Sequence, residues 1–360
     1  MKEKTIVVAA VAGLAACVAA VAEPAATNAV QRREIAVSLI GQERPNFPLE
    51  EASVARTINF LKRGMDREIA KKPDLIVLPE TCDILAGLET ADKPKWIRMR
   101  GTKVQEALQE YAAEHRCYIV YAAHREREDG LFANSCLLID RSGKVVATYD
   151  KCFPMTTEME SDFPRMPGNE AVVVDTDFGR IGFAICFDLN FPELMRAYAA
   201  KKPDIIVFSS AFDGGYLQNM WARECQAYVV SATVGPAVPG RVIDPAGGEL
   251  RHENYYMPIF TEYVNTNFRV IHLDFNSAKF PAIIGKYGRR VTIRNPGTVG
   301  TVTLLSNDPA LPVDDVMKEF SLESLGDYLD RARRVRAKYL PATNLRSFAN
   351  PPHRAYPKLP

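Results

Sequence analysis

The stretch RIGFAICFDLNFPEL, residues 180–194, decides the fold class. Its first part, 180–187, is an apolar and β-rich run typical of a buried strand, and a helix with a proline in its early turn is predicted at 192–201. Cys186 stands at this junction. We expect its sulfur to lie near backbone N–H groups and a helix start, a setting that favours the thiolate. The same setting offers an oxyanion hole, with the amide of Phe187 as the natural donor.

Outward from this stretch, short apolar runs alternate with helical segments, which is the pattern of an α/β layered fold. The predicted strands cover residues 35–40, 74–80, 118–124, 133–140, 145–151, 171–176, 180–187 and 205–211. The predicted helices cover residues 49–71, 95–115, 192–201 and a segment through 221–227.

The length of 360 residues would allow about two domains, but no Pro- or Ser-rich linker interrupts residues 34–275. We therefore predict one large domain over 34–275 and a C-terminal extension over 276–360. Within the extension, 313–340 is amphipathic and is predicted to be a helix that packs on the domain or on a neighbouring subunit. The basic segment 285–297 is predicted to be a solvated loop or hairpin.

Polar residues stand at the ends of predicted strands, where a buried sheet presents functional groups to a crevice. They are Glu80, Lys151 and Cys186. Each has a plainer interpretation, because a glutamate or lysine after a strand often faces water and a cysteine in an apolar strand is often an inert core thiol.

The motifs around these residues resemble those of the nitrilase, or carbon–nitrogen hydrolase, superfamily. They are Leu-Pro-Glu at 78–80, Tyr-Asp-Lys at 149–151, and Gly-x-x-Ile-Cys-x-Asp-x-x-Phe-Pro-Glu at 182–193, in the family order. Further similar segments are PDIIVFSSA at 203–211, WxRECQAYVV at 221–230 and GRVIDPxG at 240–247. The resemblance covers about residues 34–274.

The resemblance implies a four-layer αββα sandwich with a Glu-Lys-Cys site and no cofactor. Glu80 would take the thiol proton and later activate water, and Cys186 would attack an amide carbonyl to form a thioester. Lys151 would stabilise the oxyanion together with the Phe187 amide. The family's second glutamate corresponds to Glu158 or Glu160, and we prefer Glu158.

Other residues near the cysteine have expected roles of a different kind. Asp188 is expected to hold the loop after Cys186 through hydrogen bonds to backbone amides. Residues that would select the substrate are expected near 81–85, at Asn190 and from Ala211 to Gly215.

The order Cys-Phe-Asp at 186–188 looks more like the amidase and carbamoylase branches than the nitrilases, which generally show Cys-Trp-Glu. We therefore expect a small amide or N-carbamoyl substrate. A nitrile hydrolase, a thioester-dependent N-acyltransferase and a catalytically silent binding protein remain alternatives.

Charge and composition exclude several partners. The net charge of +1 and the even mixture of signs argue against a nucleic-acid partner. The histidines and cysteines show no HExxH motif, no CxxC pair and no zinc-ligand spacing, so no metal site is expected. The resemblance implies a homodimer or a larger homo-oligomer.

The N-terminal segment 1–22 has a basic head, an apolar run and small residues at its end, which is the layout of a secretory signal. Cleavage after Ala22 and lipidation at Cys17 both fit, and an uncleaved membrane anchor is a further alternative. Either cut removes Lys2, Glu3 and Lys4 and leaves a formally neutral chain. We therefore expect an exported protein, periplasmic or extracellular, with Cys17 as the candidate lipid anchor.

Overall fold

The computed structural model describes residues 31–235, 238, 240–252, 256–295, 297 and 300–339. The predicted leader at 1–22, the candidate lipidation site Cys17 and the last residues of the extension lie outside this range. Within the described residues, none of the helices combines the length and the apolar character needed to cross a bilayer.

Two mixed β-sheets of six strands each form the body of the described chain. The first sheet has the order β12 (Ile259–Asn265), β1 (Glu34–Ile40), β2 (Leu75–Val77), β3 (Tyr118–Glu126), β4 (Phe132–Ile139) and β5 (Val145–Asp150). The second has the order β11 (Glu249–His252), β10 (Arg241–Ile243), β9 (Tyr228–Thr233), β8 (Ile205–Ser210), β7 (Arg180–Ile185) and β6 (Val173–Asp175).

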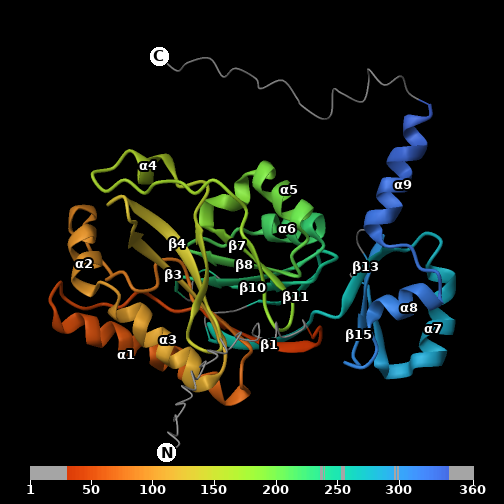
Figure 1. Cartoon of the computed structure of the whole chain (residues 1–360), viewed down its shortest axis with the longest axis horizontal. Helices are drawn as coiled ribbons and strands as arrows, with labels where there is room; N and C mark the ends of the chain where they lie inside the picture. Colours follow the sequence, from red (N-terminus) through yellow and green to blue (C-terminus); the bar gives the residue numbers. More distant parts are fainter. Residues whose placement is uncertain are drawn as a thin grey trace, which may run out of the picture.

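The two sheets face each other and helices cover their outer faces, which gives the αββα sandwich predicted from the resemblance (Figure 1). Side chains of both sheets, such as Val120 and Val207, share one buried core. Helices α1 (Ala52–Asp66) and α3 (Lys103–His115) pack on the first sheet, and α5 (Pro192–Lys201) and α6 (Tyr216–Cys225) pack on the second.

The burial of the strands explains their sequence patterns. Central strands such as β4 are buried at every position, because one face meets the other sheet and the other face meets helices. The edge strand β5 alternates between half-buried and exposed residues over most of its length. The apolar runs in the sequence therefore mark central strands, and the alternating run marks an edge.

The predicted helices differ from the observed ones where the backbone turns left-handed. The predicted helix 95–115 breaks into α2 (Lys93–Arg100) and α3, with Gly101 at φ 51° between them, a conformation that glycine adopts readily. The predicted helix 313–340 is likewise two helices, α8 (Val313–Glu319) and α9 (Leu325–Ala337).

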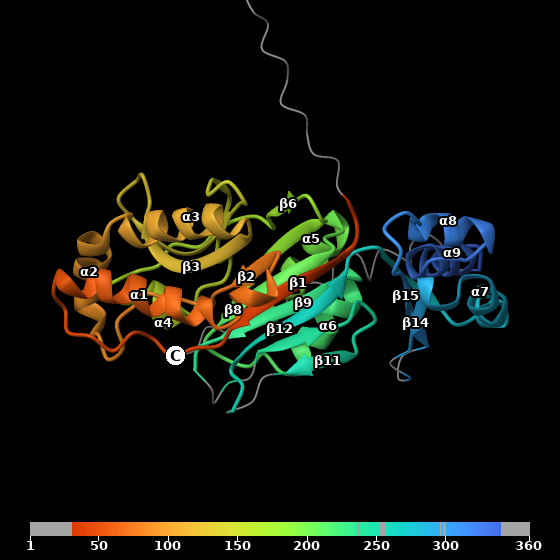
Figure 2. The same ribbon diagram turned by 90° about the horizontal axis from the view of Figure 1, so that it is seen from below.

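The C-terminal elements form a separate lobe beside the sandwich (Figure 2). A three-stranded sheet within the described residues has the order β13 (Phe268–His272), β15 (Thr301–Ser306) and β14 (Val291–Arg294). Helices α7 (Phe280–Tyr287) and α8 pack on it. The lobe therefore includes β13, which precedes residue 275. The segment 285–297, predicted to be a loop or hairpin, contributes the end of α7 and strand β14, because Ile283, Tyr287 and Val291 are buried in the lobe's core.

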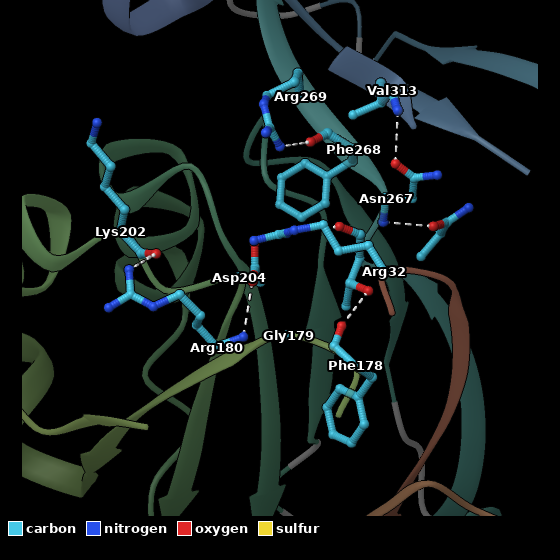
Figure 3. A network of polar contacts seen from close by, with 12 residues as sticks. Arg32, Phe178, Gly179, Arg180, Lys202, Asp204, Asn267, Phe268, Arg269 and Val313 are labelled. Atoms are coloured by element: carbon cyan, nitrogen blue, oxygen red, sulfur yellow. Dashed lines mark hydrogen bonds and ion pairs between the residues drawn. The ribbon is translucent and has the colours of Figure 1, made fainter. Parts of the chain in front are cut away.

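Polar contacts fix the lobe to the body (Figure 3). The side chain of Asn267 accepts a hydrogen bond from the amide of Val313 at 2.9 Å and donates to the carbonyl of Leu311 at 2.9 Å. Across the joint, Arg294 on β14 donates to Asp244 of the body at 2.9 Å, and the side-chain amide of Asn265 at the end of β12 donates to the carbonyl of Ser306 on β15 at 2.7 Å. Hydrogen bonds and ion pairs therefore hold the lobe against the sandwich where the chain passes from β12 to β13.

Candidate active site

The ends of strands bring the predicted site residues together. Lys151 directly follows β5, Cys186 directly follows β7, and Ala211 directly follows β8, while Glu80 lies three residues beyond β2. Lys151 and Glu80 come from the first sheet, and Cys186 and Ala211 come from the second. The site therefore lies where the carboxyl-terminal ends of strands from the two facing sheets meet.

Sharp turns at two of these strand ends aim the side chains. Cys186 has φ 48° and Thr81, which follows Glu80, has φ 49°. Non-glycine residues rarely adopt this left-handed region, and such positions gather at functional sites because the surrounding structure must hold them there. Cys186 begins a short 3₁₀ helix, Cys186–Asn190, rather than an α-helix.

Glu80 is the centre of the hydrogen-bond network. Its Oε1 accepts from Nζ of Lys151 at 3.1 Å and from the side-chain amide of Asn134 at 2.8 Å. Its Oε2 accepts from the backbone amide of Ala211 at 3.0 Å. Glu80 is 5% exposed and Lys151 is 1% exposed, so these contacts lie in a region largely closed to water.

Lys151 contacts a second carboxylate. Its Nζ lies 3.0 Å from Oε2 of Glu158, which also accepts from the amide of Met155 at 2.8 Å at the start of α4 (Thr156–Met159). Burial opposes the charge on Lys151, but Glu80, Cys186 and Glu158 together raise its pKa above the usual value. Glu160 is exposed, so the structure brings Glu158 rather than Glu160 to the lysine.

The thiol of Cys186 is held in its neutral form. Burial and the carboxylate of Glu80 raise its pKa to about 12, against the opposing effects of Lys151 and the amide of Ala211. The expectation that this setting favours the thiolate is therefore wrong. The physical reason is that the sulfur is desolvated beside an anion, and the nearest α-helix begins only at Pro192.

Asp188 holds the backbone around the cysteine, as predicted. Its carboxylate accepts from the amides of Ile185 at 2.8 Å and Phe153 at 2.9 Å, and from the hydroxyl of Tyr149 at 2.7 Å. Burial raises the pKa of Asp188 to about 6, although these donors act in the opposite direction. Asp188 thereby ties the loop after Lys151 to the turn that carries Cys186.

The structure does not bring every predicted residue into the cavity. Asn190 is exposed, and its side-chain amide donates to the carbonyl of Phe187 at 3.0 Å. The ring of Phe187 packs edge-on against Phe191. Among the described residues that line the cavity, neither Phe187 nor Asn190 is present, whereas Ala211 and Glu158 are.

A cavity of about 670 Å³ opens on the site. It is lined by Glu80, Lys151, Glu158, Cys186 and Ala211 and by residues from other segments of the chain. Prominent among them are Arg44, Thr81, Ile84, Leu85, Leu88, Lys93, His124, Lys151, Glu158, Arg165, Cys186 and Ala211. Residues 81–85, where substrate contacts were expected, contribute to this lining.

Some site residues were missed in the sequence. Asn134 contacts Glu80 because the antiparallel pairing of β4 with β5 places it opposite Lys151, whose amide donates to the carbonyl of Asn134 at 2.8 Å. The sequence marks 133–140 as the partner strand of 145–151, but a β-bulge between Leu138 and Ile139 sets the final register. Arg44, Lys93, His124 and Arg165 were also missed and carry no motif.

No group of three or more His, Cys, Asp or Glu residues is arranged to hold a metal ion in the described part of the chain. The described residues of the site offer a thiol at Cys186, carboxylates at Glu80 and Glu158, and an ammonium group at Lys151.

Comparisons with known proteins agree with this arrangement. The deaminated glutathione amidase of Dictyostelium discoideum is 25% identical over 193 residues, which is 48% of this chain and 66% of that protein. The nitrilase and fragile histidine triad fusion protein NitFhit of Caenorhabditis elegans is 28% identical over 235 residues, 57% of this chain and 53% of that protein. The matched part of the chain thus spans about half to two thirds of the length of these relatives.

Solved structures share the fold. An amidase from Nesterenkonia sp. matches with a TM-score of 0.55 at 18% identity, covering 66% of this chain and 90% of that chain. The family model for carbon–nitrogen hydrolases matches residues 35–238, which is more than half of the chain and contains Glu80, Lys151 and Cys186. The chain therefore belongs to the carbon–nitrogen hydrolase family, as its motifs predicted.

Proposed function

We propose that this protein hydrolyses the C–N bond of a small amide through a thioester on Cys186. The observation that carries the proposal is the position of Glu80, whose carboxylate contacts Lys151, Asn134 and the amide of Ala211 in the same cavity as the thiol. The family membership and a relative that is named an amidase support the same reaction class.

Formation of the thioester would begin with proton transfer from Cys186 to Glu80. The thiol needs a base because its pKa is raised to about 12 by burial and by Glu80 itself, so little thiolate exists before substrate binds. The sulfur attacks the carbonyl carbon, and the C–S bond forms. Lys151, which stays protonated, stabilises the oxyanion. The C–N bond then breaks, and Glu80 gives its proton to the leaving ammonia or amine.

Hydrolysis of the thioester would use the same groups in a second cycle. Glu80 takes a proton from water, and the hydroxide oxygen attacks the thioester carbon. The C–S bond breaks, a carboxylic acid leaves, and the proton returns to the sulfur. Lys151 and Asn134 both donate hydrogen bonds to Glu80 and hold its carboxylate in one position. A carboxylate held in this way is suited to both proton transfers, because it does not have to be reoriented between them.

Ammonia release from a panel of substrates tests the reaction class. Aliphatic amides, aryl amides, N-carbamoyl amino acids and nitriles are compared, and amide turnover is expected to exceed nitrile turnover. Cys186→Ala is expected to abolish turnover, whereas Cys225→Ala, which removes a buried thiol on α6 outside the cavity, should retain it. Amide turnover that survives in Cys186→Ala contradicts the proposal.

We propose two further properties on the basis of the sequence and the family. The leader-like segment 1–22 supports export, and the mass of the mature N-terminus distinguishes cleavage after Ala22 from lipidation at Cys17. Family resemblance supports a homo-oligomer, which light scattering on the purified protein tests. A monomer over the whole concentration range contradicts that second proposal.

A further inference from the structure

Large apolar side chains are exposed together on the C-terminal lobe. Phe275, Val335 and Tyr339 are 71%, 45% and 83% exposed. Val335 lies on α9, and Tyr339 follows it by four residues, where its amide still donates to the carbonyl of Arg336 at 3.0 Å. Residues four apart on a helix are neighbours, so Val335 and Tyr339 lie on one face.

Arg331 connects Phe275 to this face of α9. Its guanidinium carbon lies 5.1 Å from the centre of the Phe275 ring and 5.2 Å from the centre of the Tyr328 ring. Arg331 and Val335 are also four residues apart and therefore neighbours. One strip thus runs from Phe275, after β13, through Arg331 and Val335 to Tyr339.

Cations run beside this strip. Arg334 and Lys338 are exposed, and their spacing from Arg331 places them in one row along the helix. We call the strip and the row together the α9 face, which consists of Phe275, Arg331, Arg334, Val335, Lys338 and Tyr339. Residues 330–339 hold five basic side chains and one acidic one, whereas the whole chain has a net charge of +1. The remainder of the chain is therefore net negative.

The end of α9 lies beyond the packed part of the lobe. Residues 332–339 are exposed at every position, and this end of the helix projects away from the lobe (Figure 1). At the start of α9, by contrast, Leu325 is buried and Tyr328 stacks on His272. Short helices gain most of their stability from packing, and like charges on one helix repel. A surface that offers both negative charge and apolar contact would stabilise this end.

Phe275 is held in a conformation that is rare for its residue type. Its φ of 64° lies in the left-handed region, although its ring is exposed. Such positions gather at sites that contact a ligand, because the surrounding structure must impose them. The exposed ring gains little from burial within the lobe, which favours a contact that forms on binding.

We propose that the α9 face binds the surface of an anionic lipid bilayer. Phe275, Val335 and Tyr339 would enter the boundary between headgroups and acyl chains, where aromatic rings are favoured. The cationic ends of the arginines and Lys338 would stay among the phosphates. The proposal is independent of the proposed hydrolase function, because among the described residues no member of the α9 face lines the active-site cavity.

A bilayer accounts for the α9 face better than a nucleic acid does. Nucleic-acid sites usually combine aromatic platforms with a broad positive field. The positive charge here is concentrated on one helix end, and Glu323 pairs with Arg331 at 2.7 Å at its base. The proposed export would also place the α9 face where lipid is available.

Tyr339→Trp places a local fluorescent reporter on the α9 face. The native Trp96 and Trp221 are buried, and the emission of the unsubstituted protein is subtracted. The full chain is mixed with vesicles of phosphatidylcholine alone or of equal parts phosphatidylcholine and phosphatidylglycerol. A blue shift and quenching by brominated lipid are expected with the anionic vesicles, with about tenfold or weaker affinity for neutral ones. Emission that anionic vesicles leave unchanged overturns the proposal.

Charge-matched variants of the reporter protein assign the binding to the α9 face. Arg334→Gln combined with Lys338→Gln is expected to weaken binding to anionic vesicles by about tenfold or more. Arg63→Gln combined with Arg67→Gln removes two exposed charges at the end of α1 on the sandwich and should change binding by less than about twofold. Equal weakening by the two pairs overturns the proposal.

Phe275→Asn tests the apolar contact, because asparagine tolerates the left-handed backbone. Binding to anionic vesicles is expected to weaken by about tenfold, with the thermal unfolding temperature unchanged. Unchanged binding in this folded variant contradicts the proposal. Two other occupants would also overturn it: a second copy of the chain, if Phe275→Asn dissociates an oligomer while vesicles leave the emission unchanged, and a nucleic acid, if only a single-stranded oligonucleotide shifts the emission.

Discussion

The side-chain amide of Asn134 donates a 2.8 Å hydrogen bond to Oε1 of Glu80, the same oxygen that accepts from Lys151. Asn134 lies on β4 and Lys151 follows β5, so the pairing of neighbouring strands places two donors on one carboxylate oxygen. Asn134 is 1% exposed, and water has little access to replace it. Asn134 is therefore a positioning residue for the proposed base.

Asn134→Leu should slow catalysis more than it weakens binding. Loss of the donor lets the carboxylate of Glu80 rotate away from the thiol, so kcat is expected to fall by about 10- to 100-fold with KM changed much less. Steady-state kinetics on an amide substrate measure both. Asn219→Leu, which removes an amide that contacts the carbonyl of Gly247 outside the cavity, serves as the control. A rise in KM at constant kcat contradicts a positioning role.

Glu80→Gln should lower the pKa of Cys186. The negative charge of Glu80 disfavours the thiolate, so removing it leaves burial as the main cause of the raised pKa while Lys151 still stabilises the anion. The thiolate absorbance of Cys186 is measured as a function of pH in the wild type and in Glu80→Gln, and the absorbance of the matching protein with Cys186→Ala is subtracted from each. The thiolate is expected to form at lower pH in Glu80→Gln than in the wild type. A titration that moves to higher pH rules out Glu80 as a cause of the raised pKa.

Lys151→Met is expected to abolish amide turnover and to lower the free energy of unfolding. The substitution keeps the apolar stem but leaves the carboxylates of Glu80 and Glu158 without their ammonium partner in a buried site. Removing one partner of a buried ion pair typically costs about 3–5 kcal/mol. Urea unfolding measures this loss, and Lys144→Met in an exposed turn is expected to change stability by less than about 0.5 kcal/mol. Similar unfolding free energies for the two variants contradict the prediction.

A second buried ion pair stabilises the loop after Glu80. Nε of Arg100 lies 2.6 Å from Oδ2 of Asp83, which also accepts from the hydroxyl of Tyr121 at 2.6 Å. Arg100→Met would leave Asp83 buried and unpaired, so unfolding free energy is expected to fall by about 3–5 kcal/mol. Arg98→Met on the same helix removes an exposed pair with Glu126 and should cost less than about 1 kcal/mol. A smaller loss for Arg100→Met than for Arg98→Met contradicts the prediction.

The fold and the central residues could be predicted because they depend on local patterns. Apolar runs at 180–187 and 205–211 mark strands buried on both faces, and polar residues directly after strands are brought to one edge by the sheet. Glu80, Lys151 and Cys186 each stand in a motif that spans only a few residues. The match of the family model over 35–238 confirms the family that these motifs indicated.

The remaining features depend on register and on contacts between distant segments. A single bulge between Leu138 and Ile139 decides that Asn134, rather than its neighbour, lies opposite Lys151. The raised pKa of Cys186 comes from burial between two sheets, which no local motif encodes. Arg44, Lys93 and Arg165 come from three segments without a shared pattern, so only the folded cavity shows that they belong together.

The most direct test of the thioester mechanism is the mass of the protein quenched in acid during turnover of a saturating amide. The account predicts an adduct of the mass of the acyl group, located on the peptide that contains Cys186, removed by hydroxylamine and absent in Cys186→Ala. Ammonia release without any acyl adduct on Cys186, under conditions in which Cys186→Ala still turns over substrate, would contradict the account.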